Sequence, residues 1–101
     1  MATAMQIELP MAQISEICRR HQVQELSLFG SAARGDMRPD SDLDFLVDFQ
    51  PTARPGLLGF AAMMRELTDL LGRRVDLADK PALKPRVRGA ILADARVIYE
   101  A

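Results

Sequence analysis

Alternating apolar and polar residues over positions 42–49 give the clearest secondary-structure signal in the chain. Successive side chains of a strand point to opposite faces, so this alternation predicts a strand with one apolar face in the core. The other face carries aspartates at positions 42, 44 and 48 together with Leu46. Further strands are predicted over residues 24–29, 73–78 and 96–99. The apolar face of the central strand consists of Leu43, Phe45, Val47 and Phe49.

Apolar residues at helical spacing predict helices from Pro10 to about His21, over residues 57–71 and over residues 86–94. A short helical turn is predicted over residues 31–35, and Gly72 is a natural stop for the second helix. We expect Cys18 to be a small core residue and His21 to lie at a solvated helix end. The stripe expected to be buried on helix 57–71 is Leu57, Phe60, Ala61, Met64, Leu67 and Leu71. In the last helix, Val87, Ala90 and Ile91 are expected to point inward.

The resulting order, α-β-(α)-β-α-β-α-β, predicts an α/β fold in which helices pack on a small mixed sheet. The 101 residues suit one domain, which we expect to span residues 10–101 behind a flexible N-terminal arm of residues 1–9. The beginning of the chain has no basic start and no long apolar run, so neither a signal peptide nor a membrane span is expected. A cytoplasmic protein is the default expectation.

Composition narrows the possible functions. The formal net charge of −1 argues against a surface built to wrap nucleic acid. Cys18 is the only cysteine and His21 the only histidine, which excludes an internal disulfide and a cysteine-based zinc cluster.

Carboxylates on the predicted strands are the main candidate for chemistry. Asp42 and Asp44 share one strand face, and Asp76 lies between two apolar residues of the predicted strand 73–78. If the two strands are neighbours, three carboxylates converge, and oxygen ligands of this kind favour Mg²⁺ or Mn²⁺. Three carboxylates over two such ions are typical of phosphoryl or nucleotidyl transfer. Asp48 is expected to be solvated.

A possible phosphate site precedes these carboxylates. Gly30 and Ser31 stand where a predicted strand turns into a helix, where glycine permits close approach of the backbone and amides face an anion. Arg34 follows within one turn and is expected either to reach a phosphate or to pair with Asp36 or Asp40. Ser41 is expected to form a turn, with assistance to the phosphate or metal ligands as a second role.

The spacing Gly30-Ser31, ten residues, then Asp42-Leu43-Asp44 resembles the signature of the DNA polymerase β-like nucleotidyltransferase superfamily. The stretch "LFGSAARGDMRPDSDLDFLVDF" resembles the minimal nucleotidyltransferases, "RRVDLAD" stands where that family has its third carboxylate, and "ALKPRVRGAILADARVIYEA" is similar to its last helix and strand. The resemblance therefore covers nearly the whole chain after residue 10.

This resemblance implies a polymerase β-like fold and Mg²⁺-dependent transfer of AMP from ATP. It implies that Gly30, Ser31, Arg34 and Ser41 bind the nucleotide, and that Asp42, Asp44 and Asp76 hold two metal ions, with Asp76 helping to deprotonate the acceptor. The minimal members of the family are typically antitoxins that transfer AMP to a tyrosine of a HEPN-domain ribonuclease toxin. That partner and ATP are the ligands expected here, without direct binding of nucleic acid.

Two alternatives remain open at the level of sequence. In the first alternative, the chain is an adenylyltransferase that modifies a small-molecule hydroxyl, although proteins of that kind usually carry an additional helical domain for the acceptor. Alternatively, it would neutralise its partner by binding alone, with little use of the nucleotide site.

Overall fold

The strands form one mixed sheet of four strands in the order β3-β2-β1-β4. In a computed structural model, which describes residues 8–101, β1 is antiparallel to β2 and β4, whereas β2 and β3 are parallel. Residues 1–7 of the predicted N-terminal arm lie outside the described residues. The predicted α/β class with a small mixed sheet is confirmed. The strands are β1 (Val23–Phe29), β2 (Leu43–Phe49), β3 (Val75–Asp79) and β4 (Arg96–Glu100).

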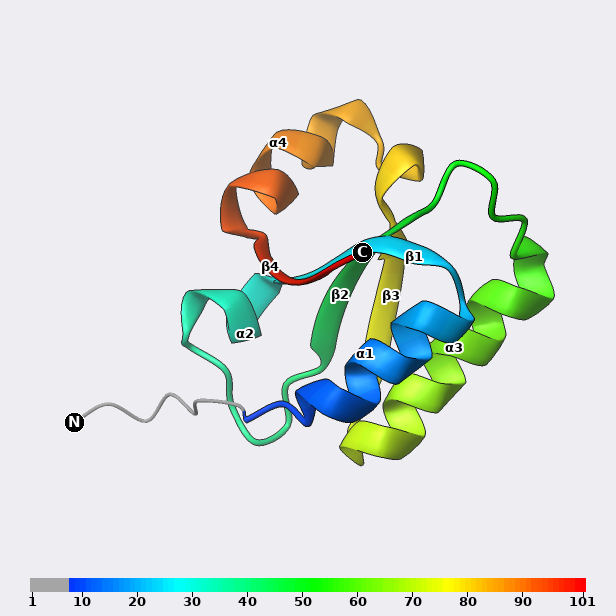
Figure 1. The fold of residues 1–101 in the computed structure, drawn as a ribbon. Coiled ribbons are helices and arrows are strands. Elements are labelled where there is room, and N and C mark those ends of the chain that lie inside the picture. The colour runs from blue at the N-terminus through cyan, green and yellow to red at the C-terminus, as the bar shows by residue number, and fades with distance from the viewer. Residues whose placement is uncertain (1–7) are drawn as a thin grey trace.

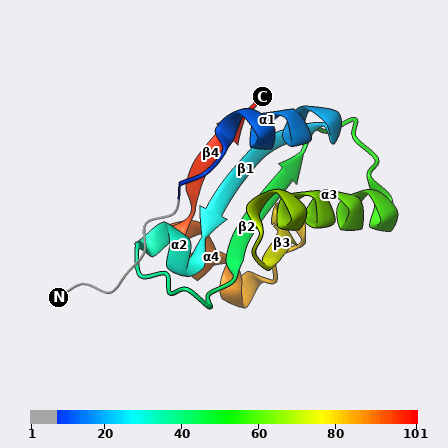
Figure 2. The same cartoon turned by 90° about the horizontal axis from the view of Figure 1, so that it is seen from below.

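The helices cover the two faces of the sheet unequally. Figure 1 shows α1 and α3 on one face, with α4 and the short 3₁₀ helix η1 on the other. From the α1/α3 side, Figure 2 shows α1 crossing near β1 and β4, and α3 lying near β3. Within residues 8–101, no helix is both long and apolar enough to cross a membrane. The helices are α1 (Met11–Arg20), α2 (Gly30–Arg34), α3 (Gly56–Leu71), η1 (Lys80–Ala82) and α4 (Pro85–Asp94).

The core lies between the sheet and the pair α1 and α3. Helix α1 buries Ile14, Ile17 and Cys18, a spacing that places all three on one helical face. The odd-numbered residues of β2 face this layer, as their alternation predicts. Cys18 is buried, as expected, and burial raises the pKa of its thiol to about 11. The main sheet and α3 contributions to the core are Val23, Leu26, Leu28, Leu43, Phe45, Val47, Met63, Leu67 and Val75.

The ends of α3 follow the sequence pattern only in part. Gly72 ends the helix in the left-handed conformation, with φ of 63° and its N–H donating to Thr68 O at 2.9 Å. The expectation that Leu57 is buried is wrong, because its side chain is 83% exposed, whereas Met63 is buried. The first turn of α3 begins before the helix reaches its contacts with α1 and β3, so an apolar side chain there finds no neighbour to cover it.

Helix α4 also departs from its predicted packing. Val87 is 40% exposed, Ala90 is exposed, and Ile91 is only half-buried, so the helix has no fully buried residue. The main contacts of α4 are with α2 and β1. Its apolar residues do not form a continuous stripe. Its position therefore depends on polar contacts and on the short connections to η1 and β4.

The position of His21 also differs from the sequence expectation. It was expected to be solvated, but its side chain is only 14% exposed and its Nε2 lies 3.1 Å from Glu66 Oε2 on α3. Arg20 binds the other oxygen of the same carboxylate at 2.6 Å. The C-terminal end of α1 is thus fastened to α3 by a contact between residues 45 positions apart in the sequence, which local periodicity does not reveal.

Candidate active site

Gly30, the first residue of α2, lies directly against Asp44 of β2. Its φ is +71°, a conformation that residues with a side chain rarely adopt. A Cβ built at this position would overlap the Asp44 carboxylate and stand 3.3 Å from its Cγ. Two independent reasons therefore require glycine at this position: its backbone conformation, and the close approach of the chain to the Asp44 carboxylate. Ser31 follows in a half-buried position.

The register of the sheet brings the predicted carboxylates together. Strands β2 and β3 are parallel neighbours, and Asp44 stands opposite Asp76. Asp42 is half-buried immediately before β2, and Asp76 is exposed. Burial, reinforced by the negative charges of Asp76 and Asp42, raises the pKa of Asp44, while Arg34 acts in the opposite direction. Asp44 is therefore close enough to both other aspartates to be repelled by them.

This repulsion makes the site suited to a divalent cation. Carboxylate oxygens are hard ligands, and a cation between them would replace repulsion by attraction. Within residues 8–101, no three acidic, histidine or cysteine side chains are arranged to enclose a metal ion by themselves. Mg²⁺ is usually held by one or two carboxylates together with substrate phosphates, so the residues fit an ion completed by a nucleotide.

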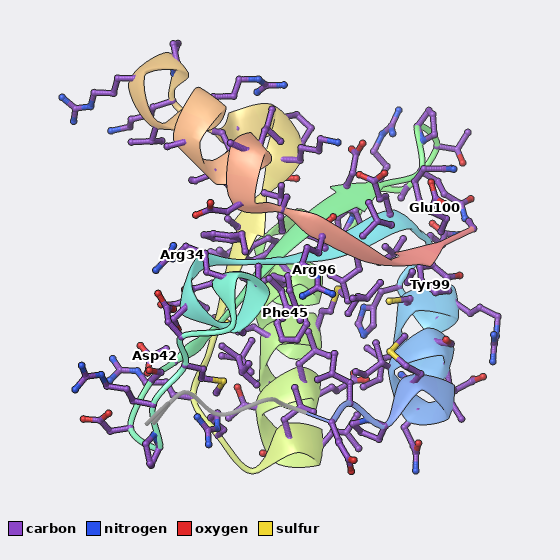
Figure 3. The ribbon with its side chains drawn as sticks, turned by 90° about the vertical axis from the view of Figure 1, so that its left-hand side faces the viewer. Arg34, Asp42, Phe45, Arg96, Tyr99 and Glu100 are labelled. Atoms are coloured by element: carbon purple, nitrogen blue, oxygen red, sulfur yellow. The ribbon has the colours of Figure 1, made fainter. Side chains whose placement is uncertain are left out.

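Arg34 lies at the same end of the sheet as Asp42 (Figure 3). Of the alternatives raised by the sequence, the pair with Asp36 forms, with 3.3 Å between Arg34 Nε and Asp36 Oδ2. A second carboxylate, Asp94 of α4, accepts from Arg34 Nη1 at 2.8 Å. Arg96 of β4 also donates to Ala33 O at 3.4 Å. Helix α2 is thus fastened to α4 and β4 by residues some 60 positions away, which sequence reasoning missed.

Ser41 forms the turn that precedes Asp42. Its Oγ accepts from the Arg38 N–H at 2.9 Å, and its own N–H donates to Arg38 O at 3.0 Å. Arg73, just before β3, donates to the carbonyls of Ser41 and Arg38 at 3.0 and 3.3 Å. Arg74 Nε lies 4.0 Å from Asp42 Oδ2. These two arginines position the turn and were assigned no role from the sequence, although they stand only three and two residues before Asp76.

Asp48 lies four residues beyond Asp44 on β2, and its neighbours show that it belongs to another group of charges. It was expected to be solvated but is half-buried. Burial and the Asp48 charge raise the pKa of Asp79. Lys80, the residue after Asp79, pairs with Glu25 of β1 at 2.9 Å.

Comparison with known proteins identifies the class of this site. Residues 11–98 match the family model described as the nucleotidyltransferase domain, and the chain belongs to that family. The sequence resemblance to nucleotidyltransferases is thereby confirmed.

One curated relative extends the comparison over most of the chain. The chain is 41% identical over 88 residues to the protein adenylyltransferase MntA of Thermococcus cleftensis, covering 87% of this chain and 85% of that protein.

Solved structures give a consistent fold. A candidate minimal nucleotidyltransferase superposes with a TM-score of 0.72 at 40% identity, covering 85% of this chain and 86% of that one. A chain from a toxin–antitoxin crystal structure with AMP-PNP superposes with a TM-score of 0.76 at 21% identity, covering 92% and 75%. A chain from the complex of a tri-AMPylated Shewanella oneidensis HEPN toxin with an MNT antitoxin gives 0.66 at 18%, covering 90% and 70%. The last two likenesses concern the fold alone.

Proposed function

We propose that this protein is a Mg²⁺-dependent protein adenylyltransferase antitoxin, which transfers AMP from ATP to a tyrosine hydroxyl of a HEPN-domain toxin and thereby neutralises it. The observation that carries the proposal is the packing of Gly30 against Asp44 with Asp76 opposite in the sheet. This juxtaposition puts the glycine turn, suited to phosphates, beside carboxylates suited to a divalent cation. The curated relative named a protein adenylyltransferase supports a protein as the acceptor.

In this proposal, Gly30 and Ser31 bind the phosphates of ATP, and Arg34 and Ser41 contribute to nucleotide binding. Asp42, Asp44 and Asp76 hold two Mg²⁺ ions, with Mn²⁺ as a possible replacement. The bound metal supplies charge neutralisation at the phosphates and lowers the pKa of the attacking hydroxyl. As part of the same proposal, the reaction occurs in the cytoplasm, where ATP is available.

The chain's own groups then have defined tasks. The tyrosine oxygen attacks the α-phosphorus in line, the bond from that phosphorus to the bridging oxygen breaks, and pyrophosphate leaves. Asp76 is the exposed member of the three aspartates, which suits it to receive the hydroxyl proton from an acceptor that approaches from solvent. Asp42 and Asp44 serve the nucleotide side of the site. The product is a tyrosine phosphodiester carrying AMP.

Intact mass spectrometry tests the proposal directly. A HEPN-domain protein encoded beside this chain is incubated with it, ATP and Mg²⁺, and a mass increase of one or more AMP units is expected. Asp76→Asn should abolish the increase. Asp48→Asn is the matched control, because it removes a carboxylate from the same strand-face pattern away from the site and should keep the activity.

The remaining outcomes separate the alternatives. A tight complex with no mass increase would replace enzymatic neutralisation by neutralisation through binding alone. If the two proteins form no complex and no mass increase is seen, the HEPN-domain protein is refuted as the partner. Transfer of AMP to small hydroxyl compounds would then be measured.

A further inference from the structure

Two consecutive leucines at the start of α3 are among the most exposed large apolar side chains in the described part of the chain. Leu57 is 83% exposed and Leu58 is 86% exposed. The other exposed large apolar residues of that part, on α4 and β4, are only 37 to 50% exposed. A single exposed leucine needs no explanation, but adjacent large apolar side chains are typical of contact surfaces for other molecules. These leucines add nothing to the core described above.

A groove of about 150 Å³ lies beside the leucines. It is formed where the end of α1 meets the segment leading into α3, and its lining includes His21, Arg54, Pro55 and Gly59. A Cβ at Gly59 would stand 3.1 Å from Pro55 Cβ, so a larger residue in this wall of the groove would press on the proline. The groove and the leucines belong to the same turn of chain, with Leu57 and Leu58 between Pro55 and Gly59.

Charge around the groove indicates the chemistry of an occupant. Arg54 Nη1 donates to the carbonyls of Pro51 and Ala53, both at 3.0 Å, and no carboxylate of residues 8–101 lies within 4.0 Å of its guanidinium nitrogens. Arg20, by contrast, is neutralised by Glu66. The rim therefore keeps a positive charge. A second copy of this chain, docked about a two-fold axis here, would bring two Arg54 side chains together, which is unfavourable.

The position of this surface separates it from the aspartates. Strand β2 begins next to Asp42 and ends at Phe49, from which the chain passes through residues 50–55 to α3. Seven strand residues span roughly 20 Å. Figures 1 and 2 show α2 and the start of α3 at opposite ends of the sheet. A protein bound at the leucines would leave the nucleotide and acceptor positions open.

We propose that Leu57, Leu58, Arg54 and the adjoining groove form a docking surface for the acceptor protein, separate from the site of AMP transfer. This inference rests on the proposed function for the identity of that acceptor. The matching surface on the acceptor is apolar and carries a carboxylate that binds Arg54. Docking there raises the local concentration of the acceptor hydroxyl without adding to the chemical step.

Substitutions at exposed positions test the proposal without disturbing the core. Leu57→Ser, Leu58→Ser and Arg54→Glu are compared with wild type, and Val87→Ser on the opposite sheet face is the matched control. Calorimetry measures binding to the HEPN-domain protein, and steady-state kinetics measure AMP transfer to it. For each leucine variant we expect at least roughly a tenfold increase in Kd and in the acceptor KM. The kcat, the KM for ATP and the Tm should remain at wild-type values.

Other results would overturn the docking surface. Leucine variants with wild-type Kd and acceptor KM would do so, as would a drop in kcat equal to the loss in kcat/KM. A dimer of the chain alone, seen by light scattering and lost in the leucine variants, would show that a second copy occupies the surface. If wild type binds the HEPN-domain protein but transfers no AMP, and the leucine variants still lose binding, the docking surface stands and the adenylyltransferase function falls.

Discussion

Substitution of Gly30 by alanine is the sharpest test of the proposed site, because one methyl group would meet both a backbone restriction and a carboxylate. The residue has φ of +71°, and the added Cβ would overlap Asp44. Asp44 can respond only by rotating its carboxylate away or by shifting β2. Either response removes that carboxylate from its place between the α2 turn and Asp76.

Gly35 provides the matched control for the size of the effect. It has φ of +79°, but a Cβ there would meet no atom within 4 Å. Gly35→Ala should therefore show the backbone strain alone, about 1–2 kcal/mol of unfolding free energy. For a domain of this size, each kcal/mol of unfolding free energy lost lowers the Tm by roughly 4–8 °C. Gly30→Ala should lose the same amount plus about 1 kcal/mol or more if β2 has to shift.

Activity should separate the two variants more clearly than stability. Displacing a catalytic group by about 1 Å costs on the order of a hundredfold in rate. We therefore expect AMP transfer by Gly30→Ala to fall at least about a hundredfold, while Gly35→Ala stays near wild type under conditions where both are folded. The double variant Gly30→Ala/Asp44→Ala should lose less activity than the two single losses combined, because both changes displace or remove the same carboxylate.

Thermal unfolding followed by circular dichroism and transfer of radiolabelled AMP give the two measurements. The reasoning is refuted if Gly30→Ala transfers AMP as fast as Gly35→Ala, since the collision with Asp44 would then have no consequence. It is equally refuted if the two glycine variants lose activity to the same extent, which would assign the loss to backbone strain.

Three further outcomes are expected from groups whose pKa the fold shifts. Asp44→Asn removes a repelled carboxylate and should raise unfolding free energy by about 0.5–1 kcal/mol while abolishing AMP transfer, and a destabilised variant in urea denaturation would contradict this. Glu66 has its pKa lowered from the usual 4.5, first by the hydrogen bond from Arg20 and then by His21. The stability this provides is complete above pH 4.5 and is lost as pH falls through the lower folded-state value, so Glu66→Gln should show a shallower acid decline in Tm. Cys18, with a pKa of about 11, should not react with a thiol reagent at pH 8 until the chain is unfolded.

Local pattern predicted most of this fold because each strong signal came from a few adjacent residues. The alternation along β2 placed Asp42 and Asp44 on the face away from the core, and Gly72 marked the end of α3. The same signals failed where burial depends on a distant element. Periodicity shows which side chains share a face of α3 or α4, but whether the sheet or another helix covers that face is a tertiary property. Leu57 and Val87 were misjudged for this reason.

The geometry of the candidate site depends on long-range contacts in the same way. The signature spacing pointed to Gly30 and Asp44, but their contact follows from the β1–β2 register, which pairs Phe29 with Asp44. That pairing brings the residue after Phe29 onto the Asp44 side chain, and the parallel β2–β3 register sets Asp76 opposite. A slip of one residue in either register would turn an aspartate toward the core. The apolar face of β2 therefore fixes the arrangement of the aspartates on the other face, and stability of the core and geometry of the site are set by the same strand.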